Sequence, residues 1–410
     1  MMFPALFLMA APVFHKDIEP LLQKHCQQCH RAGEAAPMPL TTYEQVRPWA
    51  KAIRQAVVQG TMPPWHADPS VGKFANDSRL APAEIESIRQ WVDNGAPRGR
   101  SSDAPRPVRF ASGWNIGQPD AIFEMPVDFE IPAKGDIDYI HFAVPTNFTE
   151  DRWIQSMEVR PGNRANVHHI GVYLRRKGST WLPQVKAGGE GTPLRDRLTG
   201  RSAIDEHFAM YLPGYGGEIL ADGQARKIPA GAELIFQLHY ISTGKPARDR
   251  SRIGFVFAKQ PVRELIHTVP VGDPAIVIPP GDPEYKSRAN FFVSMPLRVL
   301  GIAPHMHLRG KSFACDSILP DKSRQALLSI PKYDRNWQRR YLLADPPSLP
   351  KGSWIQCRAV FDNSPNNPWN PDPAATVRWG DQTRDEMMVG YVDVALPPDA
   401  QPERFYSRPK

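Results

Sequence analysis

Two cysteines and a histidine near the N-terminus form the most specific chemical motif of the sequence. Cys26 and Cys29 are separated by two glutamines, and His30 follows directly. Thiols at this spacing can add to both vinyl groups of one haem, and the next histidine is placed to ligate its iron. A zinc knuckle or a redox dithiol would use the same cysteines, but zinc needs a second ligand pair that is missing nearby. The motif therefore predicts one covalent haem c.

A methionine beyond the next predicted helix is the expected second axial ligand. Met38 follows His30 too closely to reach the opposite haem face easily, whereas Met62 lies past a full helix, in Thr-Met-Pro-Pro-Trp-His. We predict Met62 as this ligand, with His66 as the alternative; His/Met ligation would raise the reduction potential. The cysteine motif, the Met-Pro loop and a closing helix resemble the small bacterial cytochrome c family over residues 14–100.

Further along the chain, histidines gather in three short segments. These are His168 and His169 in Asn-Val-His-His-Ile, His239 in Leu-His-Tyr, and His305 and His307 in Pro-His-Met-His-Leu. Residues at i and i+2 of a strand share a face, so His305 and His307 can converge on one metal. Adjacent His168 and His169 can share a metal only at a bulge or strand end, for which Gly171 is a candidate marker. We assign the remaining histidines of this kind to hydrogen-bonded core positions: His15, His25, His141, His207 and His267.

The order of these segments resembles the copper type II, ascorbate-dependent monooxygenases, the family of peptidylglycine hydroxylating monooxygenase and dopamine β-hydroxylase. In that family, a His-His pair and the histidine of a Leu-x-His-Tyr strand hold one copper, and a His-x-His pair with a Glu-Met methionine holds the other. The resemblance covers residues 115–397 and implies two jelly-roll β-sandwiches with one copper each, facing across a solvent gap. It assigns one copper to His168, His169 and His239, and the other to His305, His307 and Met387.

The second ligand set is the one that discriminates between metals. Imidazole with a thioether suits Cu(I), whereas zinc usually takes Cys, His or carboxylate, so Met387 indicates copper. A core role for Met387 or Met388 is the alternative. Tyr391 matches a substrate-pocket tyrosine of the family. A structural role in the core is the alternative and has equal weight. Ala303 replaces the arginine that holds a substrate carboxylate in the peptide-processing member, so glycine-extended peptides are not expected substrates.

The surrounding pattern predicts the elements that position these residues. Helices are expected over Tyr43–Gln59 and Ala83–Asn94, and a linker rich in Pro, Arg and Ser over Pro97–Gly113. Beyond it, alternating segments predict sandwich strands at Trp153–Val159, Val167–Leu174, Leu234–Ile241 and Trp354–Phe361. We therefore expect a small all-α cytochrome c domain followed by two all-β jelly-roll sandwich domains. The predicted parts are a signal peptide (1–13), a cytochrome c domain (14–100), a linker (101–114), an N-terminal sandwich (115–260) and a C-terminal sandwich (261–400).

The beginning of the chain favours export. An apolar run at Phe3–Ala11 is typical of a signal peptide, although it lacks a basic start, and an apolar tail is the alternative. No later apolar run reaches the ~18 residues of a membrane span. We expect a periplasmic or otherwise exported protein. By the resemblance, the family's cysteine after the ligand methionine is replaced by Met388, so Cys357 is free or pairs with Cys315, and an exported protein would tolerate that disulfide.

The basic balance of the chain does not predict nucleic-acid binding. The net charge is +7, but no recognition motif or aromatic-basic platform accompanies it. The charge supports only a mild preference for acidic redox partners.

Together these features predict a copper-dependent monooxygenase-like oxidoreductase that hydroxylates a small substrate with dioxygen. The reaction consumes two electrons and each copper cycles one, so both must be reduced before a turnover. Ascorbate does this in the relatives; here the tethered haem is the expected donor to the copper of His168, His169 and His239, since a short tether gives effective concentrations of about millimolar. A redox donor protein or small reductant would reduce the haem. The alternatives are a non-catalytic haem/copper electron-transfer or copper-handling protein, and a scaffold whose histidines hold zinc or nothing.

Overall fold

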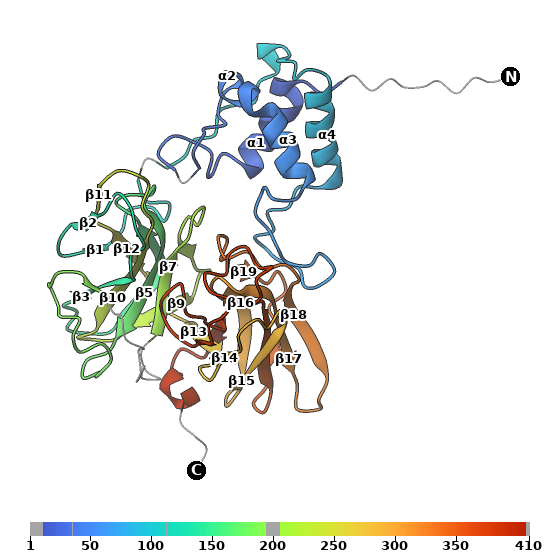
Figure 1. Cartoon of the computed structure of the whole chain (residues 1–410). Coiled ribbons are helices and arrows are strands. Elements are labelled where there is room, and N and C mark those ends of the chain that lie inside the picture. Colours follow the sequence, from blue (N-terminus) through green and yellow to red (C-terminus); the bar gives the residue numbers. More distant parts are fainter. Residues whose placement is uncertain (1–10, 35, 112, 194–205, 407–410) are drawn as a thin grey trace. The chain divides into compact units, whose positions relative to one another are not determined.

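The computed structural model describes residues 11–34, 36–111, 113–193 and 206–406. The described residues form two compact units, one within residues 1–65 and 78–111 and the other within residues 66–77 and 112–410 (Figure 1). The apolar run predicted as a signal peptide lies almost entirely outside the described residues. In the described part of the chain, no helix has both the length and the apolar character needed to cross a membrane.

Short helices pack around one apolar core in the N-terminal unit, where Phe14, Leu22 and Trp91 are fully buried. The helix expected over Tyr43–Gln59 is interrupted at Pro48, because proline lacks the backbone donor that a continuous helix needs. The last predicted helix is confirmed, with Asn94 as its C-cap. The elements are a π-helical turn Phe14–Ile18, α1 Glu19–His25, α2 Tyr43–Val46, a 3-10 turn Arg47–Trp49, α3 Ala50–Val58, α4 Pro82–Asp93 and a 3-10 turn Ser101–Asp103.

The expected fold class is wrong in its first part. The described chain is mostly β, with 35% of residues in strands and 12% in helices, and the two longest α-helices have only 9 and 12 residues. No separate all-α cytochrome c domain is present among the described residues, because residues 66–77 leave the N-terminal unit and belong to the β unit. The physical reason is proline and glycine: Pro37, Pro39, Pro63 and Gly72 break the stretches between helices into turns and loops.

The β-sandwich part of the expected fold class agrees with the structure. One face of the first sandwich is a five-stranded sheet in the order β6-β3-β10-β5-β7, and one face of the second is a four-stranded sheet in the order β15-β21-β17-β18. The bounds are β3 Ile140–Pro145, β5 Val167–Arg175, β6 Thr192–Pro193, β7 Glu206–Tyr211, β10 Glu233–Tyr240, β15 Tyr285–Phe292, β17 Gly310–Ile318, β18 Arg324–Ile330 and β21 Trp354–Phe361.

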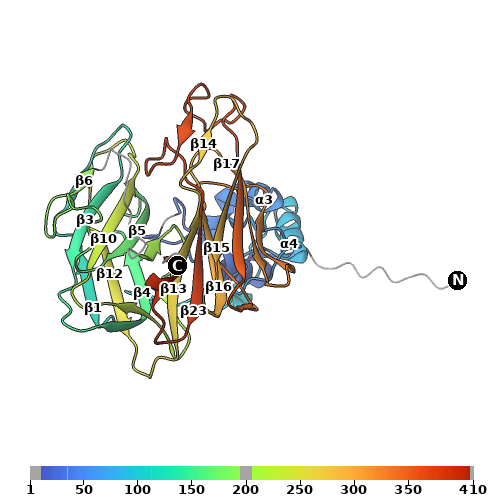
Figure 2. The same ribbon diagram turned by 90° about the horizontal axis from the view of Figure 1, so that it is seen from below.

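One ten-stranded sheet runs through both sandwiches in the order β1-β12-β4-β9-β13-β23-β16-β19, with β8 on β4 and β20 on β16 (Figure 2). The two sandwiches are thus joined by backbone pairing, where β9 meets β13 in parallel. The bounds are β1 Ala121–Glu124, β4 Arg152–Arg160, β8 Glu218–Ile219, β9 Gln224–Ile228, β12 Arg252–Phe257, β13 Glu264–Gly272, β16 Leu297–His305, β19 Tyr341–Leu342, β20 Ser348–Leu349 and β23 Val389–Leu396. The remaining elements are the pairs β2 Phe129–Ile131 with β11 Ala247–Asp249 and β14 Val277–Ile278 with β22 Val377–Arg378, and a 3-10 turn Pro402–Tyr406.

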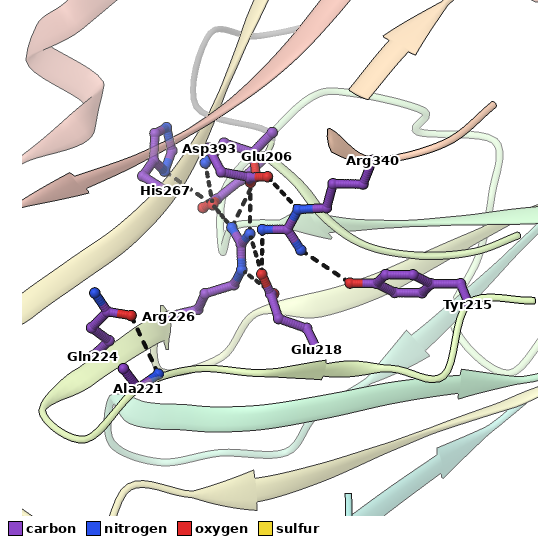
Figure 3. A network of polar contacts seen from close by, with 10 residues as sticks. Glu206, Tyr215, Glu218, Ala221, Gln224, Arg226, His267, Arg340 and Asp393 are labelled. Atoms are coloured by element: carbon purple, nitrogen blue, oxygen red, sulfur yellow. Dashed lines mark hydrogen bonds and ion pairs between the residues drawn. The ribbon is translucent and has the colours of Figure 1, made fainter. Parts of the chain in front are cut away.

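A buried charge network stabilises this junction (Figure 3). Arg226 of β9 contacts Glu218 at 2.9 Å and Asp393 of β23 at 2.8 Å. Arg340 joins the same two carboxylates, with its Nε 2.7 Å from Asp393. Glu206 completes the set at 3.7 Å from Arg226. Buried charges are tolerated only when they are paired in this way, and the network links β9 with β7, β8 and β23.

A disulfide links the two inner strands of the four-stranded sheet. Cys315 of β17 lies directly opposite Cys357 of β21 and is bonded to it. The pairing left open by the sequence is therefore formed. Structural disulfides persist in oxidising compartments, which fits an exported protein.

Candidate metal centres

Three histidines of the first sandwich converge because β5 carries a bulge. His169 of β5 lies opposite His239 of β10, and the register then shifts so that His168 is an extra residue. Of the two arrangements that the sequence left open, a bulge or a strand end, the structure has the bulge, and it lies at His168 and not at Gly171. One ring nitrogen from each of the three histidines lies within 4.8 Å of the others. We refer to this group as the three-histidine site.

The Nδ1 atoms of the three-histidine site have each other or no partner among the described residues. The Nδ1 atoms of His168 and His169 are 3.0 Å apart, and Nδ1 of His239 is buried with no hydrogen-bond partner among the described residues. The opposite nitrogens have hydroxyl neighbours, Tyr139 at 3.2 Å from His169 and Thr383 at 3.4 Å from His239. A buried polar atom without a partner costs about 1–3 kcal/mol, and a shared metal ion would remove that cost.

A second site forms at the end of β16, where the Nε2 atoms of His305 and His307 are 3.1 Å apart. Nδ1 of His307 faces the Asp385 carbonyl at 3.1 Å, and Nδ1 of His305 faces Oε1 of Gln338 at 2.5 Å. The Gln338 amide is oriented by its own donation to the Arg335 carbonyl. Since carbonyl oxygens only accept, each Nδ1 carries the proton and each Nε2 keeps its lone pair. With this tautomer the two Nε2 lone pairs face each other, and a cation held by both would remove their repulsion.

The Glu386-Met387 segment lies against this histidine pair. The buried Glu386 carboxylate accepts from the backbone N–H of His307 at 2.9 Å and of Arg309 at 2.6 Å, and burial raises its pKa to about 7. Met387 follows directly and lines the same cavity as His305. The carboxylate therefore ties the predicted thioether ligand to the predicted imidazole pair. We refer to His305, His307 and Met387 as the His/Met site.

All five histidines of the two sites are neutral at neutral pH. Burial, with smaller effects of nearby charges, lowers the pKa of His168 to about 4 and of His239 to about 3. Burial and repulsion between neighbouring rings hold the pKa of His169 and His307 well below the usual value, and burial also lowers the pKa of His305. Neutral imidazole is the metal-binding form, so protons do not compete strongly for these sites at neutral pH.

A cavity of about 590 Å³ reaches both sites. His169 and His305 both line it, and their ring centroids are 6.4 Å apart. The two sites therefore approach each other more closely than the solvent gap implied by the family resemblance. Among the described residues, neither lysine nor arginine lines the cavity, and its wall is rich in aromatic rings: Tyr139, Tyr173, Trp181, Trp379 and Tyr391.

Tyr391 is the predicted pocket residue, and the structure places it in this cavity. Its ring stacks on His207 with centroids 4.4 Å apart and lies 6.3 Å from the ring of His305. Ala303, the position singled out in the sequence, also lines the cavity.

The cysteine motif follows α1 in the N-terminal unit. Cys26 and Cys29 are half-buried, and burial, assisted by the neighbouring thiol, raises the pKa of Cys26 to about 12. Nδ1 of His30 lies 3.1 Å from the Met38 carbonyl, to which it donates, leaving the Nε2 lone pair for an axial metal bond. This orientation fits a haem-ligating histidine.

Met62 belongs to the same unit as His30 but lies on a different loop, after α3. Its side chain is half-buried, and its backbone N–H donates to the Ala56 carbonyl. His66, the alternative ligand, belongs to the β unit. That placement favours Met62 over His66.

The residues that orient the ligands were not found from the sequence. Tyr139 is 30 residues from His169, Gln338 is 33 from His305, and Thr383 is 144 from His239, so no local motif links them. Of the histidines assigned to the core, His207 lines the cavity instead. The others have polar neighbours as expected, namely His15 with Glu19, His25 with Glu84, His141 with Gln237 and His267 with Glu206.

Comparisons with known proteins do not identify the chain. No protein-family model matches it, and no curated protein matches it. Similar solved structures include the VP2 subviral particle of infectious bursal disease virus, at 10% identity over 71% of this chain and 75% of that chain, with a TM-score of 0.20. PNGase F, a glycosylasparaginase from Flavobacterium meningosepticum, is 11% identical over 66% of this chain and 96% of its own, with a TM-score of 0.25. Likenesses this weak bear on neither fold nor function.

Proposed function

We propose that the chain is a copper-dependent, monooxygenase-like oxidoreductase that hydroxylates a small substrate with dioxygen, with electrons supplied through a c-type haem on the same chain. The observation that supports it best is the approach of the Nε2 atoms of His305 and His307 to 3.1 Å, with His305 at the wall of a large cavity. The three-histidine site opens on the same cavity through His169. The ordered ligand motifs, with their resemblance to the copper type II monooxygenases, supply the reaction class.

Both sites fit a metal ion. His168, His169 and His239 would hold one copper, and His305, His307 and Met387 the other. An all-imidazole set suits zinc as well as copper, whereas the thioether of Met387 favours Cu(I) at the His/Met site. When bound, copper supplies one-electron redox chemistry and dioxygen activation.

The chain's own residues prepare the ligands and the substrate space. Gln338 and the Asp385 carbonyl hold the Nδ1 protons of the His/Met site, which keeps both Nε2 atoms available. Aromatic walls exclude water and bind apolar surface. Tyr391, which stacks on His207 and lies near His305, would contact the substrate.

The N-terminal unit would hold the haem. Cys26 and Cys29 would form the thioether bonds, and His30 and Met62 would be the axial ligands. The haem would supply single electrons, at a potential raised by His/Met ligation. A redox donor protein or small reductant would reduce it in a periplasmic or otherwise exported setting, where the disulfide also persists.

Metal and haem content of the purified protein tests this proposal. We expect two coppers and one haem per chain when the protein is exported with haem-maturation machinery present. Met387→Ala should lose or weaken copper at the His/Met site. Met210→Ala is the matched control, because it removes a thioether packed against the same residues that is not a predicted ligand. Full copper content in Met387→Ala, or zinc alone in the wild type, would contradict the proposal.

The second candidate function is a non-catalytic haem/copper electron carrier, which the short distance between the rings of His169 and His305 favours. Measurement of oxygen consumption distinguishes this carrier from the oxygenase. The oxygenase consumes dioxygen in proportion to hydroxylated product. The carrier exchanges electrons between haem and copper without product. A panel of small aromatic substrates without a carboxylate suits the cavity best.

A further inference from the structure

The chain leaves β16 at the first ligand of the His/Met site. His305 is the last residue of β16 and lies opposite Val389 of β23, where the ladder between these two strands ends. His307 follows two residues later, beyond the strand. Ligands at i and i+2 share a face only while the residue between them stays extended. The position of His307 relative to His305 therefore depends on what holds the backbone of Met306.

One side-chain hydroxyl bonds both polar backbone groups of Met306. The Tyr333 hydroxyl accepts from the Met306 N–H at 3.0 Å and donates to the Met306 carbonyl at 3.1 Å. In an antiparallel sheet, a residue of a hydrogen-bonded pair exchanges the same two bonds with the residue opposite it. A tyrosine hydroxyl has one donor and two lone pairs, so it can serve both groups at once. Tyr333 thus takes the place of a strand partner just beyond the end of the β16 ladder.

The packing around these bonds excludes water. Met306 is fully buried, and Tyr333 is only 9% exposed. Gly310, the first residue of β17, allows the two side chains to approach, because a Cβ there would lie 2.9 Å from both the Met306 Cβ and the Tyr333 ring. Buried backbone groups need a partner. Without the hydroxyl, the Met306 segment would have to shift to find one, and the ligands on either side would move with it.

The loop between β18 and β19 carries this hydroxyl and is fixed at both ends. Before the loop, the Ser329 carbonyl accepts from the Asp68 N–H at 2.8 Å. At its other end, the Arg340 carbonyl accepts from the Asn76 side chain at 2.7 Å. Asp68 and Asn76 belong to the same compact unit as the loop. The hydroxyl therefore has a fixed place in the fold against which the ligand backbone is held.

We propose that Tyr333 is a positioning residue of the His/Met site. It acts through the backbone of Met306, which it keeps extended so that the Nε2 atoms of His305 and His307 converge. Gln338, on the same loop, faces the ring of His305, so this one loop controls both the backbone and the ring orientation of that ligand. The inference rests on the proposed function, because it takes the His/Met site to bind copper.

Tyr333→Phe tests the inference, because it keeps the buried ring and removes only the hydroxyl. In the full-length protein, the affinity of the His/Met site for Cu(I), measured by competition with a chelator, should fall about 10–100-fold, the usual range for a group that orients metal ligands. The three-histidine site should keep its wild-type affinity. X-ray absorption of the Cu(I)-loaded variant should show less imidazole scattering per copper than the wild type, a change that a purely structural role would not produce.

Tyr341→Phe is the matched control. Tyr341 is also buried, and its hydroxyl also bonds a backbone group, that of His66. Because His66 is not a ligand of either site, Tyr341→Phe should lower the urea midpoint by an amount similar to that of Tyr333→Phe and keep wild-type copper affinity at both sites.

Gly310→Ala provides a second test that removes no hydrogen bond. Its added methyl group would crowd Met306 and the Tyr333 ring, so it should weaken copper binding at the His/Met site alone. Wild-type affinity in Tyr333→Phe, or an equal loss in Tyr341→Phe, would overturn the inference and leave the proposed function in place. A wild-type protein that binds no copper at the His/Met site would overturn the proposed function, and titration of the wild type shows this before any variant is compared.

Discussion

The two candidate metal centres are built in different ways. The ligands of the three-histidine site come from two neighbouring strands, and a single bulge brings them together. The His/Met site combines a strand end, a turn and a distant loop, held by two carbonyl acceptors and the Glu386 carboxylate. The ligands of the three-histidine site are positioned by many backbone hydrogen bonds between paired strands, whereas those of the His/Met site are positioned by a few buried polar groups. We therefore expect single polar substitutions to affect the His/Met site more.

The largest effect should come from breaking the junction that both sites share. Arg226→Met removes a buried guanidinium and leaves Glu218 and Asp393 with half of their counter-charge. Loss of one partner of a buried ion pair costs about 3–5 kcal/mol. Urea unfolding should show this loss, together with weaker copper binding at both sites.

The neighbour on the same strand provides the control. Lys227 pairs with Asp151 at 3.1 Å, with both side chains partly exposed. Surface ion pairs contribute about 0–1 kcal/mol, so Lys227→Met should unfold at nearly the wild-type urea concentration. Equal losses in the two variants would show that the buried network does not hold the junction.

Acid should weaken the junction by a smaller amount than removal of Arg226, because protonation removes one carboxylate charge at a time. Burial raises the pKa of Glu218 and Asp393, but the charges of Arg226 and Arg340 outweigh it and hold both values below normal. Their stabilisation is therefore complete above the unfolded pKa of about 4 and is lost as the pH falls through the lower folded values.

Unfolding midpoints at pH 7, 5 and 3 check this window. The stabilisation from these two carboxylates should be unchanged between the first two and fall at the third. In Arg226→Met the same two carboxylates have lost one neighbouring cation. Protonation in acid removes part of their uncompensated negative charge, so the difference in unfolding midpoint between variant and wild type should become smaller at pH 3. A difference that stays constant with pH would contradict the assigned ionisation.

The next effect should be confined to the His/Met site. In Glu386→Gln, an amide NH₂ replaces one of the two oxygens that accept from His307 and Arg309, so one buried N–H faces another donor. Leaving a buried donor unsatisfied costs about 1–3 kcal/mol. Copper titration should show loss of the second copper and retention of the first. Loss of the three-histidine copper instead would mean that the two sites are not independent.

The sequence predicted the ligands of each site better than the residues that orient them. The convergence of His305 and His307 and the need for a bulge or strand end at His168 and His169 follow from local rules. The structure brings the first pair to 3.1 Å and has a bulge at His168. The supports Gln338 and Thr383 were out of reach, because they meet their histidines only through tertiary packing. The helical unit was predicted as a separate domain because local periodicity does not show that residues 66–77 pack elsewhere.

The smallest expected effect is also the sharpest test of the comparison. Gln338→Leu removes the acceptor 2.5 Å from His305, and Thr383→Val removes a hydroxyl 3.4 Å from His239. Loss of a group that orients a metal ligand typically lowers metal affinity about 10–100-fold. The Thr383 contact is long, and strand pairing also holds the three-histidine site. Thr383→Val should therefore lower copper affinity by less than that range, whereas Gln338→Leu should lower it by an amount within the range. Competition with a copper chelator at each site gives both values. Equal losses would show that the bulged strands are no firmer a support than the loop, and that sheet pairing does not set the difference between the two centres.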